Sequence, residues 1–196
     1  MNSKQAGSGT DIALIAVFAA LLAVLAVVPG VPMPGSSMPI TLQTLGVLLA
    51  GLVLGPWRGA LSVLLYLLVG FAGLPIFAQG SGGLAVFSSM SIGYLLSFPL
   101  AALVSGGLAS WFVRSGFKGR YLWLTIAAVV GSFLVIDTAG ITGMMIVGQV
   151  DLLTSFIYNL PFVLGDAIKC FAAAAIAVAV NKAFPLLLAS RKPVAA

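Results

Sequence analysis

The sequence predicts an all-α membrane protein in which one domain crosses the bilayer with six transmembrane helices. Hydrophobic residues make up 61% of the 196 residues and charged residues only 7%, whereas soluble domains carry about 25% charged residues. Glycines and prolines divide the apolar residues into several runs, and the basic residues lie mostly between these runs. Because a helix needs about 20 apolar residues to span a bilayer, several crossings are expected.

Six apolar runs are candidate spans. In order they are Ile12–Val28, Ile40–Leu54, Ala60–Phe77, Ser91–Val113, Tyr121–Val147 and Phe156–Leu188. The first has Lys4 before it, as a signal peptide would, but PGVPMPG follows where small residues for cleavage should stand, so we expect it to be retained. The second is short because prolines bound it, and Pro185 predicts that the last run ends in a break or a surface segment. We expect residues 11–190 to form this domain, with tails at 1–10 and 191–196.

The positions of the basic residues predict the orientation. With six spans, every Lys and Arg except Lys169 falls on one side of the membrane, while the loops 29–39, 78–90 and 148–155 contain none. The positive-inside rule then places both termini in the cytoplasm, in a prokaryotic plasma membrane. Membrane topology thus explains the net charge of +5 without a nucleic-acid partner. Trp57, Trp111 and Trp123 lie near the inner ends of the spans and are typical of interfacial anchors.

The residue types exclude most enzyme chemistry. The chain has no His and one Cys, so a zinc site, a His-based triad, a redox pair or a disulfide cannot be built. Cys170 lies in an apolar run and is expected to be a packing residue. The glycine cluster at 80–83 lacks the Lys of a phosphate-binding loop. We therefore expect no enzyme activity, no metal and no cofactor.

Two charges in the last run point to a ligand site. Asp166 and Lys169 are three residues apart, so on a helix they share a face and can pair. Each would cost about 2.5–3.5 kcal/mol at the centre of a bilayer on insertion scales. The pair would lie near the outer end of the last span, on the side of the Gly-rich loops. It could bracket a polar ligand, with Asp166 accepting from N–H groups and Lys169 donating to a carbonyl, or it could only lock helix packing.

Three further polar residues lie within the apolar runs. Asp137 could accept from a hydroxyl, pair with Lys169, stay protonated, or carry a proton in coupled transport. Gln43 and Tyr94 lie near the outer ends of their spans, where each could line the same cavity or make an interhelical hydrogen bond.

The first apolar run carries a stripe of alanines. Ala13, Ala16, Ala20 and Ala23 recur there at spacings of three and four, which gives a smooth stripe for another helix. The stripe could pack within this chain or against a partner.

Five short motifs follow one another along the chain. They are P-x-T-L-Q-T, L-G-P-x-x-G, G-L-P-x-F, G-S-G-G and, in PFVLGDAIK, G-D-x-x-K, in this order. Together they resemble the BioY family, the biotin-specific S components of energy-coupling factor (ECF) transporters. The similarity runs from about Ala13 to Lys182. It implies six helices with both termini inside, and biotin bound near the outer surface.

The resemblance also assigns roles to residues. It implies that Asp166 and Lys169 hold the ureido ring, and that loop 77–83 with Tyr94 lines the rest of the pocket. From the loop we expect contributions from Phe77, Gly80, Ser81, Gly82 and Gly83, beside Gln43 from the second span. Relatives can carry Arg where this chain has Ser81, so Ser81 and backbone N–H groups remain to hold the valerate carboxylate.

The resemblance implies partners as well. They are a transmembrane coupling protein, which the alanine stripe would contact, and two ATPase subunits. The alternatives are an S component for another vitamin, an autonomous proton-coupled carrier that uses Asp137 or Asp166, and a structural membrane scaffold.

Overall fold

The computed structural model describes residues 3–32, 38–185 and 187–188. Over these ranges the chain consists of helices and loops, with one isolated β-bridge between Val31 and Ile40. The long elements are α1 (Ser3–Val27), α2 (Gln43–Leu54), α3 (Pro56–Phe71), α4 (Ile92–Arg114), α5 (Arg120–Val129), the π-helical segment η3 (Val130–Asp137), α6 (Thr138–Val147) and α7 (Leu152–Ala183). Two short 3₁₀ turns, η1 (Ala78–Gly80) and η2 (Leu84–Ser88), lie in the loop between α3 and α4.

Four helical stretches among the described residues are long and apolar enough to cross a membrane. They are Gly9–Val27, Ile92–Arg114, Arg120–Val147 and Leu152–Ala183, and the third joins α5, η3 and α6 into one rod. The helices α2 and α3 are shorter but also apolar. The protein is therefore a multi-pass membrane protein, and a count of six full crossings stays a prediction.

The helix boundaries differ most from the predicted spans at the first and third runs, while α2 begins three residues later than predicted and α7 begins four residues earlier. The third run was expected at Ala60–Phe77, but α3 begins at Pro56 and ends at Phe71. Pro56 suits a first helical position because its fixed φ matches the helix and it lacks only an N–H that would be unpaired there, and Gly73, at φ 112°, follows the end. The first helix begins at Ser3 instead of Ile12, because helical structure continues through polar residues before the apolar run.

The last helix ends close to where proline predicts an end. It begins at Leu152, where the side chain of Asp151 accepts from the Thr154 backbone N–H at 3.0 Å. It stops at Ala183, two residues before Pro185. Pro161 lies inside this helix.

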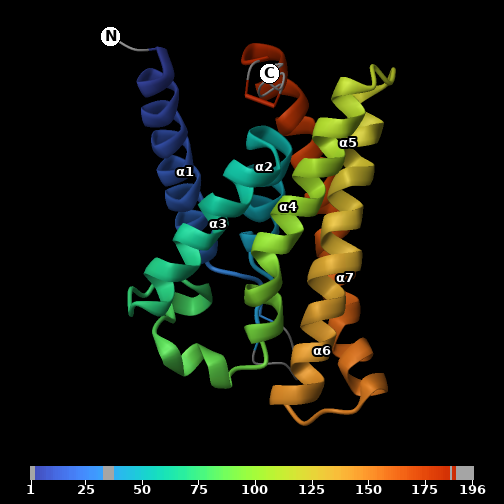
Figure 1. Cartoon of the computed structure of the whole chain (residues 1–196). Coiled ribbons are helices and arrows are strands. Elements are labelled where there is room, and N and C mark those ends of the chain that lie inside the picture. The colour runs from blue at the N-terminus through green and yellow to red at the C-terminus, as the bar shows by residue number, and fades with distance from the viewer. Residues whose placement is uncertain (1–2, 33–37, 186, 189–196) are drawn as a thin grey trace.

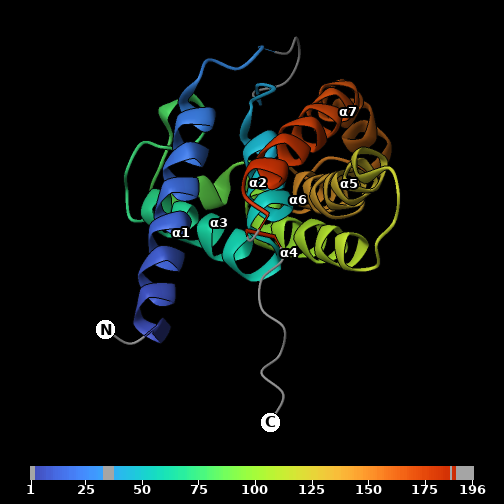
Figure 2. The same ribbon diagram turned by 90° about the horizontal axis from the view of Figure 1, so that it is seen from above.

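The short helix α2 forms the centre of the molecule. All of its residues except Leu45 are buried, and Figures 1 and 2 show α1 and α3 on one side of it and α5, α6 and α7 on the other. Glycines let its backbone approach α4 closely, since a Cβ on Gly51 would lie 2.6 Å from the Ala102 carbonyl oxygen. Such contacts matter because lipid gives helices no hydrophobic reason to associate, and close packing must supply the attraction.

The two ends of the bundle differ in what they carry. The start of α1, the end of α7, and the α2–α3 and α4–α5 junctions lie at one end, whereas the loop between α3 and α4 and the α6–α7 connection lie at the other (Figure 1). Consequently Arg58, Arg114, Lys118 and Arg120 share one end. This arrangement agrees with the predicted side of the basic loops, while the membrane face to which that end belongs stays a prediction.

Candidate ligand-binding site

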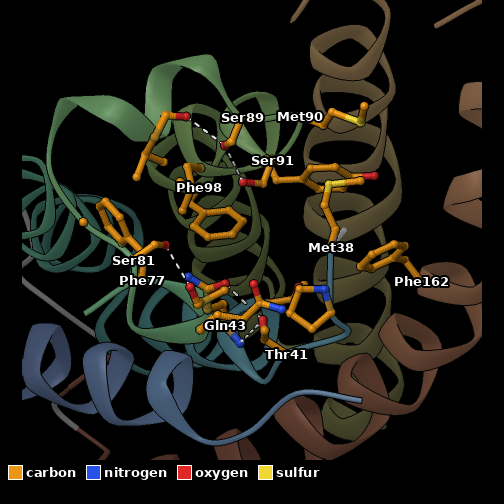
Figure 3. Close-up of a pocket in the computed structure, with 18 of the residues that line it drawn as sticks. Met38, Thr41, Gln43, Phe77, Ser81, Ser89, Met90, Ser91, Phe98 and Phe162 are labelled. Carbon is orange, nitrogen blue, oxygen red and sulfur yellow. Dashed lines mark hydrogen bonds between the residues drawn. The ribbon is translucent and has the colours of Figure 1, made fainter. Parts of the chain in front are cut away.

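A cavity of about 610 Å³ lies at the end of the bundle opposite the basic loops. Its walls come from the segment before α2 and the start of α2, from the loop between α3 and α4, from the start of α4, and from the middle of α7. Figure 3 shows Gln43 and Thr41 on one side of this space, Ser89 and Ser91 on another, and Phe98 between them. The cavity is thus built from segments that are far apart in the sequence.

The Asp166–Lys169 pair lines this cavity from α7. The Lys169 Nζ donates to Asp166 Oδ1 at 2.7 Å, and the two residues are only 7% and 2% exposed. Thr44 of α2 lies beside the Asp166 carboxylate. The predicted pairing therefore exists, and it places one acceptor group and one ammonium on the wall of a cavity. The expected position near the end of the last span is wrong, because α7 begins at Leu152 and the pair lies near the middle of this helix.

Gln43 both lines the cavity and bonds to another helix. Its Nε2 donates to the Tyr66 hydroxyl of α3 at 2.7 Å, and that hydroxyl donates to the Ile76 carbonyl at 3.2 Å. The Thr41 hydroxyl donates to Gln43 Oε1 at 3.0 Å. Both roles that the sequence left open for Gln43 are therefore present, and Tyr66, which sequence reasoning missed, fixes its amide.

The glycine-rich loop forms the outer wall. Phe77, Gly80, Ser81 and Gly82 line the cavity, whereas Gly83 is not among its lining residues. Instead, the Gly83 N–H donates to the Gly70 carbonyl at 2.8 Å and ties the loop to α3. Gly83 thus lies behind the wall rather than on it.

Phe77 anchors the same loop. It is 1% exposed, and its ring meets Tyr66 and Phe71 edge-on, each at 5.3 Å between ring centroids. A Cβ on Gly70 would collide with this ring. The Phe77 N–H also donates to the Ser81 carbonyl at 2.9 Å, so the loop is closed by its own backbone.

Tyr94 lines the cavity from α4 and is held from behind. Its hydroxyl donates to Asn159 Oδ1 of α7 at 2.6 Å. Its ring lies 5.9 Å from that of Phe162, and Gly140 leaves the space that the ring occupies. Asn159, which is 2% exposed, was not singled out from the sequence. Its signal was the same as that of Gln43, namely an amide side chain inside an apolar run.

Asp137 lies outside the cavity lining. It is 4% exposed on η3, and the Asn159 side chain is its polar neighbour. Neither carboxylate oxygen makes a hydrogen bond of ordinary length and angle to a described residue, and Asp137 is not among the residues that line the cavity. The expectations that it pairs with Lys169 or accepts from a hydroxyl are therefore wrong for this structure. Cys170 is buried and free, as a packing residue would be.

The alanine stripe lies on the outer helix α1. Ala13, Ala16 and Ala20 are exposed, while Ala23 is partly buried against the core. The described part of the bundle therefore leaves most of the stripe open.

The cavity and its ion pair are typical of one class of protein. A buried ion pair faces a cavity of small-molecule size at one end of a membrane-spanning helical bundle, which is typical of a membrane protein that binds a small polar ligand.

Comparison with known proteins identifies the family. The pattern described as "BioY family" matches residues 1–186, so the chain belongs to this family. It is 38% identical over 182 residues to "Biotin transporter BioY" of Rhizobium etli, which covers 92% of this chain and 97% of that protein. It is 35% identical to the protein of the same name from Rhodobacter capsulatus, with 92% of this chain and 98% of that protein covered.

A solved structure agrees with the fold. The crystal structure of the S-component for biotin from an ECF-type ABC transporter superposes with a TM-score of 0.84 at 28% identity, covering 93% of this chain and 95% of that one. The chain therefore has the all-helical S-component fold that the resemblance implied.

Proposed function

We propose that this chain is the biotin-binding S component of an ECF-type transporter, a transport subunit and not an enzyme. The observation that carries the proposal is the Asp166–Lys169 pair on the wall of a cavity, in a chain whose relatives are named biotin transporters.

The pair suits the ureido ring of biotin. That ring offers two N–H donors and one carbonyl, and an ionised carboxylate only accepts while an ammonium only donates. Asp166 would therefore accept from the ring N–H groups, and Lys169 would donate to the ring carbonyl. Hydrogen bonds to charged groups are stronger than neutral ones, so this end of the ligand would be fixed most firmly.

The rest of the cavity suits the remainder of the ligand. Leu95, Phe98 and Phe162 give apolar surface for the sulfur-containing ring and the chain. Ser81, Ser89 and Ser91 also line the cavity, and the Ser89 and Ser91 hydroxyls are 2.8 Å apart. We propose that these hydroxyls and the backbone N–H groups of the Gly-rich loop hold the valerate carboxylate, because the chain has Ser81 where a cation would otherwise be expected.

Partners follow from the same assignment. We propose that a transmembrane coupling protein with two ATPase subunits drives inward delivery of biotin, and that Ala13, Ala16 and Ala20 of α1 contact the coupling protein. The membrane is proposed to be a prokaryotic plasma membrane, with the basic end of the bundle in the cytoplasm.

The contact with the coupling protein can be tested by co-purification. The wild type is compared with a double variant that carries Ala16→Leu and Ala20→Leu. Loss of co-purification at unchanged biotin binding supports the contact.

The deciding experiment is calorimetric titration of biotin into the detergent-purified chain. We expect tight binding that weakens by about 2 kcal/mol or more in Asp166→Asn and Lys169→Ala, a loss of well over tenfold in affinity. Matched controls on the same helix are Asp151→Asn and Lys182→Ala, which change charges outside the cavity and should leave affinity unchanged. A wild-type chain that binds no biotin but binds another vitamin would overturn the assignment.

A further inference from the structure

A second cavity, of about 360 Å³, lies at the opposite end of the same helices. The biotin cavity is lined from the start of α2 and α4, whereas this one is lined by Leu54 at the end of α2 and Arg114 at the end of α4. Since α2 alone has 12 residues and therefore spans about 18 Å, the two cavities are separate sites.

The start of α3 supplies hydrogen-bond donors to this cavity. Gly55 caps the helix without a side-chain hydrogen bond, and Pro56 has no N–H. The next two N–H groups, of Trp57 and Arg58, belong to the first turn, where a helix offers no internal acceptor. The first internal bond runs from the Gly59 N–H to the Gly55 carbonyl at 3.0 Å. A helix start with free donors favours an anion.

A buried hydroxyl points to a ligand at the same place. Ser110 of α4 lines the cavity, is 4% exposed, and its Oγ has no hydrogen-bond partner among the described residues. It lies against the start of α3, since a Cβ on Gly55 would come 3.4 Å from this Oγ. Gly106, one turn earlier, allows the approach, because a Cβ there would lie 2.7 Å from the Gly55 carbonyl carbon. A buried hydroxyl normally has a partner, and an acceptor in the cavity would be one.

The charges at the cavity favour an anion over a cation. Arg58 and Arg114 line it, and no Asp or Glu is among its described lining residues. Arg58 Nε is 3.2 Å from Asp11 Oδ1 of α1, which leaves other guanidinium N–H groups for a further partner. The ends of α2 and α4 carry about half a negative charge each, so the balance with both arginines and the start of α3 stays positive even with Asp11 included.

Two tryptophans indicate the depth of the cavity in the membrane. Trp57 and Trp111 line it and are 72% and 56% exposed. Tryptophan gathers at the level of the lipid headgroups. Phospholipid headgroups present their phosphates at this depth, where basic pockets between helices can bind them.

We infer that this cavity binds the phosphate of an anionic phospholipid headgroup. Arg58 and Arg114 make charge-assisted hydrogen bonds to the phosphate, the first-turn N–H groups of α3 add neutral ones, and the Ser110 hydroxyl donates to a headgroup oxygen. This site does not depend on biotin binding at the other end.

The test is native mass spectrometry of the full chain in a neutral detergent. The probes are phosphatidylglycerol, phosphatidylcholine and inorganic phosphate, each titrated separately. Phosphatidylglycerol should bind about tenfold more tightly than phosphatidylcholine. Arg114→Gln should weaken it about fivefold, and Ser110→Ala about threefold, with unchanged helix content.

The matched control is Lys118→Gln, which removes an exposed positive charge at the same end but outside the cavity. It should leave lipid binding unchanged. Equal affinity for the two lipids, or a loss in Lys118→Gln as large as in Arg114→Gln, would overturn the inference in favour of diffuse attraction. Inorganic phosphate that displaces phosphatidylglycerol at equal concentration would overturn the lipid source and leave a site for soluble phosphate.

Discussion

Asp166 and Asp137 are both buried carboxyl groups in apolar helices, yet their surroundings differ. Asp166 receives a hydrogen bond from Lys169 at 2.7 Å and faces the cavity. Asp137 lies outside the cavity lining with the Asn159 side chain as its polar neighbour, and it makes no hydrogen bond of ordinary length and angle to a described residue. A buried charge is tolerated where a partner and further hydrogen bonds offset its desolvation, so only the first site is built to hold an ionised carboxylate against a ligand. The comparison teaches that neighbours from other helices decide what an intramembrane Asp does.

The largest expected effect comes from separating the members of the ion pair. Asp166→Asn or Lys169→Met alone leaves one uncompensated buried charge, which costs about 3–5 kcal/mol of stability. The double variant removes both charges, so it should regain most of the melting temperature of the wild type while biotin binding stays lost. Thermal unfolding and calorimetry of the three variants measure both quantities. A double variant that binds biotin as tightly as the wild type would make the pair a packing lock.

An intermediate effect is expected one layer behind the cavity. Asn159→Leu removes the acceptor of the Tyr94 hydroxyl and leaves a buried O–H unpaired, which costs about 1–3 kcal/mol. Biotin affinity should fall severalfold because Tyr94 loses its fixed position. The control is Tyr94→Phe together with Asn159→Leu, in which no hydroxyl is left unpaired. Stability in that double variant should recover, as measured by thermal unfolding, and recovery would be absent if Asn159 acted only through its volume.

Asp137→Asn should have a smaller effect than Asp166→Asn, because Asp137 lies outside the cavity lining. No hydrogen bond from a described residue is lost in this substitution, so the change in stability should stay below about 1 kcal/mol. Biotin affinity should remain within about threefold of the wild type. Calorimetry at neutral pH tests this directly. A loss as large as that of Asp166→Asn would show that the two carboxyl groups are equivalent in function.

The smallest effect is expected at Asp151, an exposed carboxylate that caps α7. The Thr154 hydroxyl and backbone N–H donate to its two oxygens at 2.6 and 3.0 Å, and these hydrogen bonds lower the pKa of Asp151 below its ordinary value. The cap therefore contributes stability above the ordinary Asp pKa and loses it as the pH falls through the lowered value. Asp151→Ala should lower the melting temperature slightly at neutral pH, and the difference from the wild type should shrink in acid. A difference that is constant with pH would exclude an electrostatic cap.

Much of the candidate site could be predicted from the sequence because its central pair is local. Asp166 and Lys169 are one helical turn apart, so the helix alone brings them together. The end of α3 was predicted at Phe77, because the apolar residues continue to that position, but the helix stops at Phe71. Gly73 and Pro75 in the same stretch are the signals of a helix end that the apolar pattern outweighed. Gly83 was expected on the cavity wall with the other glycines of its cluster. The sequence of a glycine cluster does not show which of its members faces a ligand, so this expectation could not be refined without the structure.

The fold class, the positions of the apolar runs, the clustering of the basic residues and the pairing of two charges in α7 could all be inferred from the amino-acid order alone. These depend on composition and on contacts within one helix, which chain geometry sets. Contacts between distant residues came from the folded bundle alone. Tyr66 fixes Gln43, 23 residues away, and Asn159 holds Tyr94, 65 residues away. Asp137 likewise has Asn159 as its polar neighbour and not Lys169 as an ion-pair partner. Such contacts depend on which faces of distant helices meet, and that follows from packing of the whole bundle around α2.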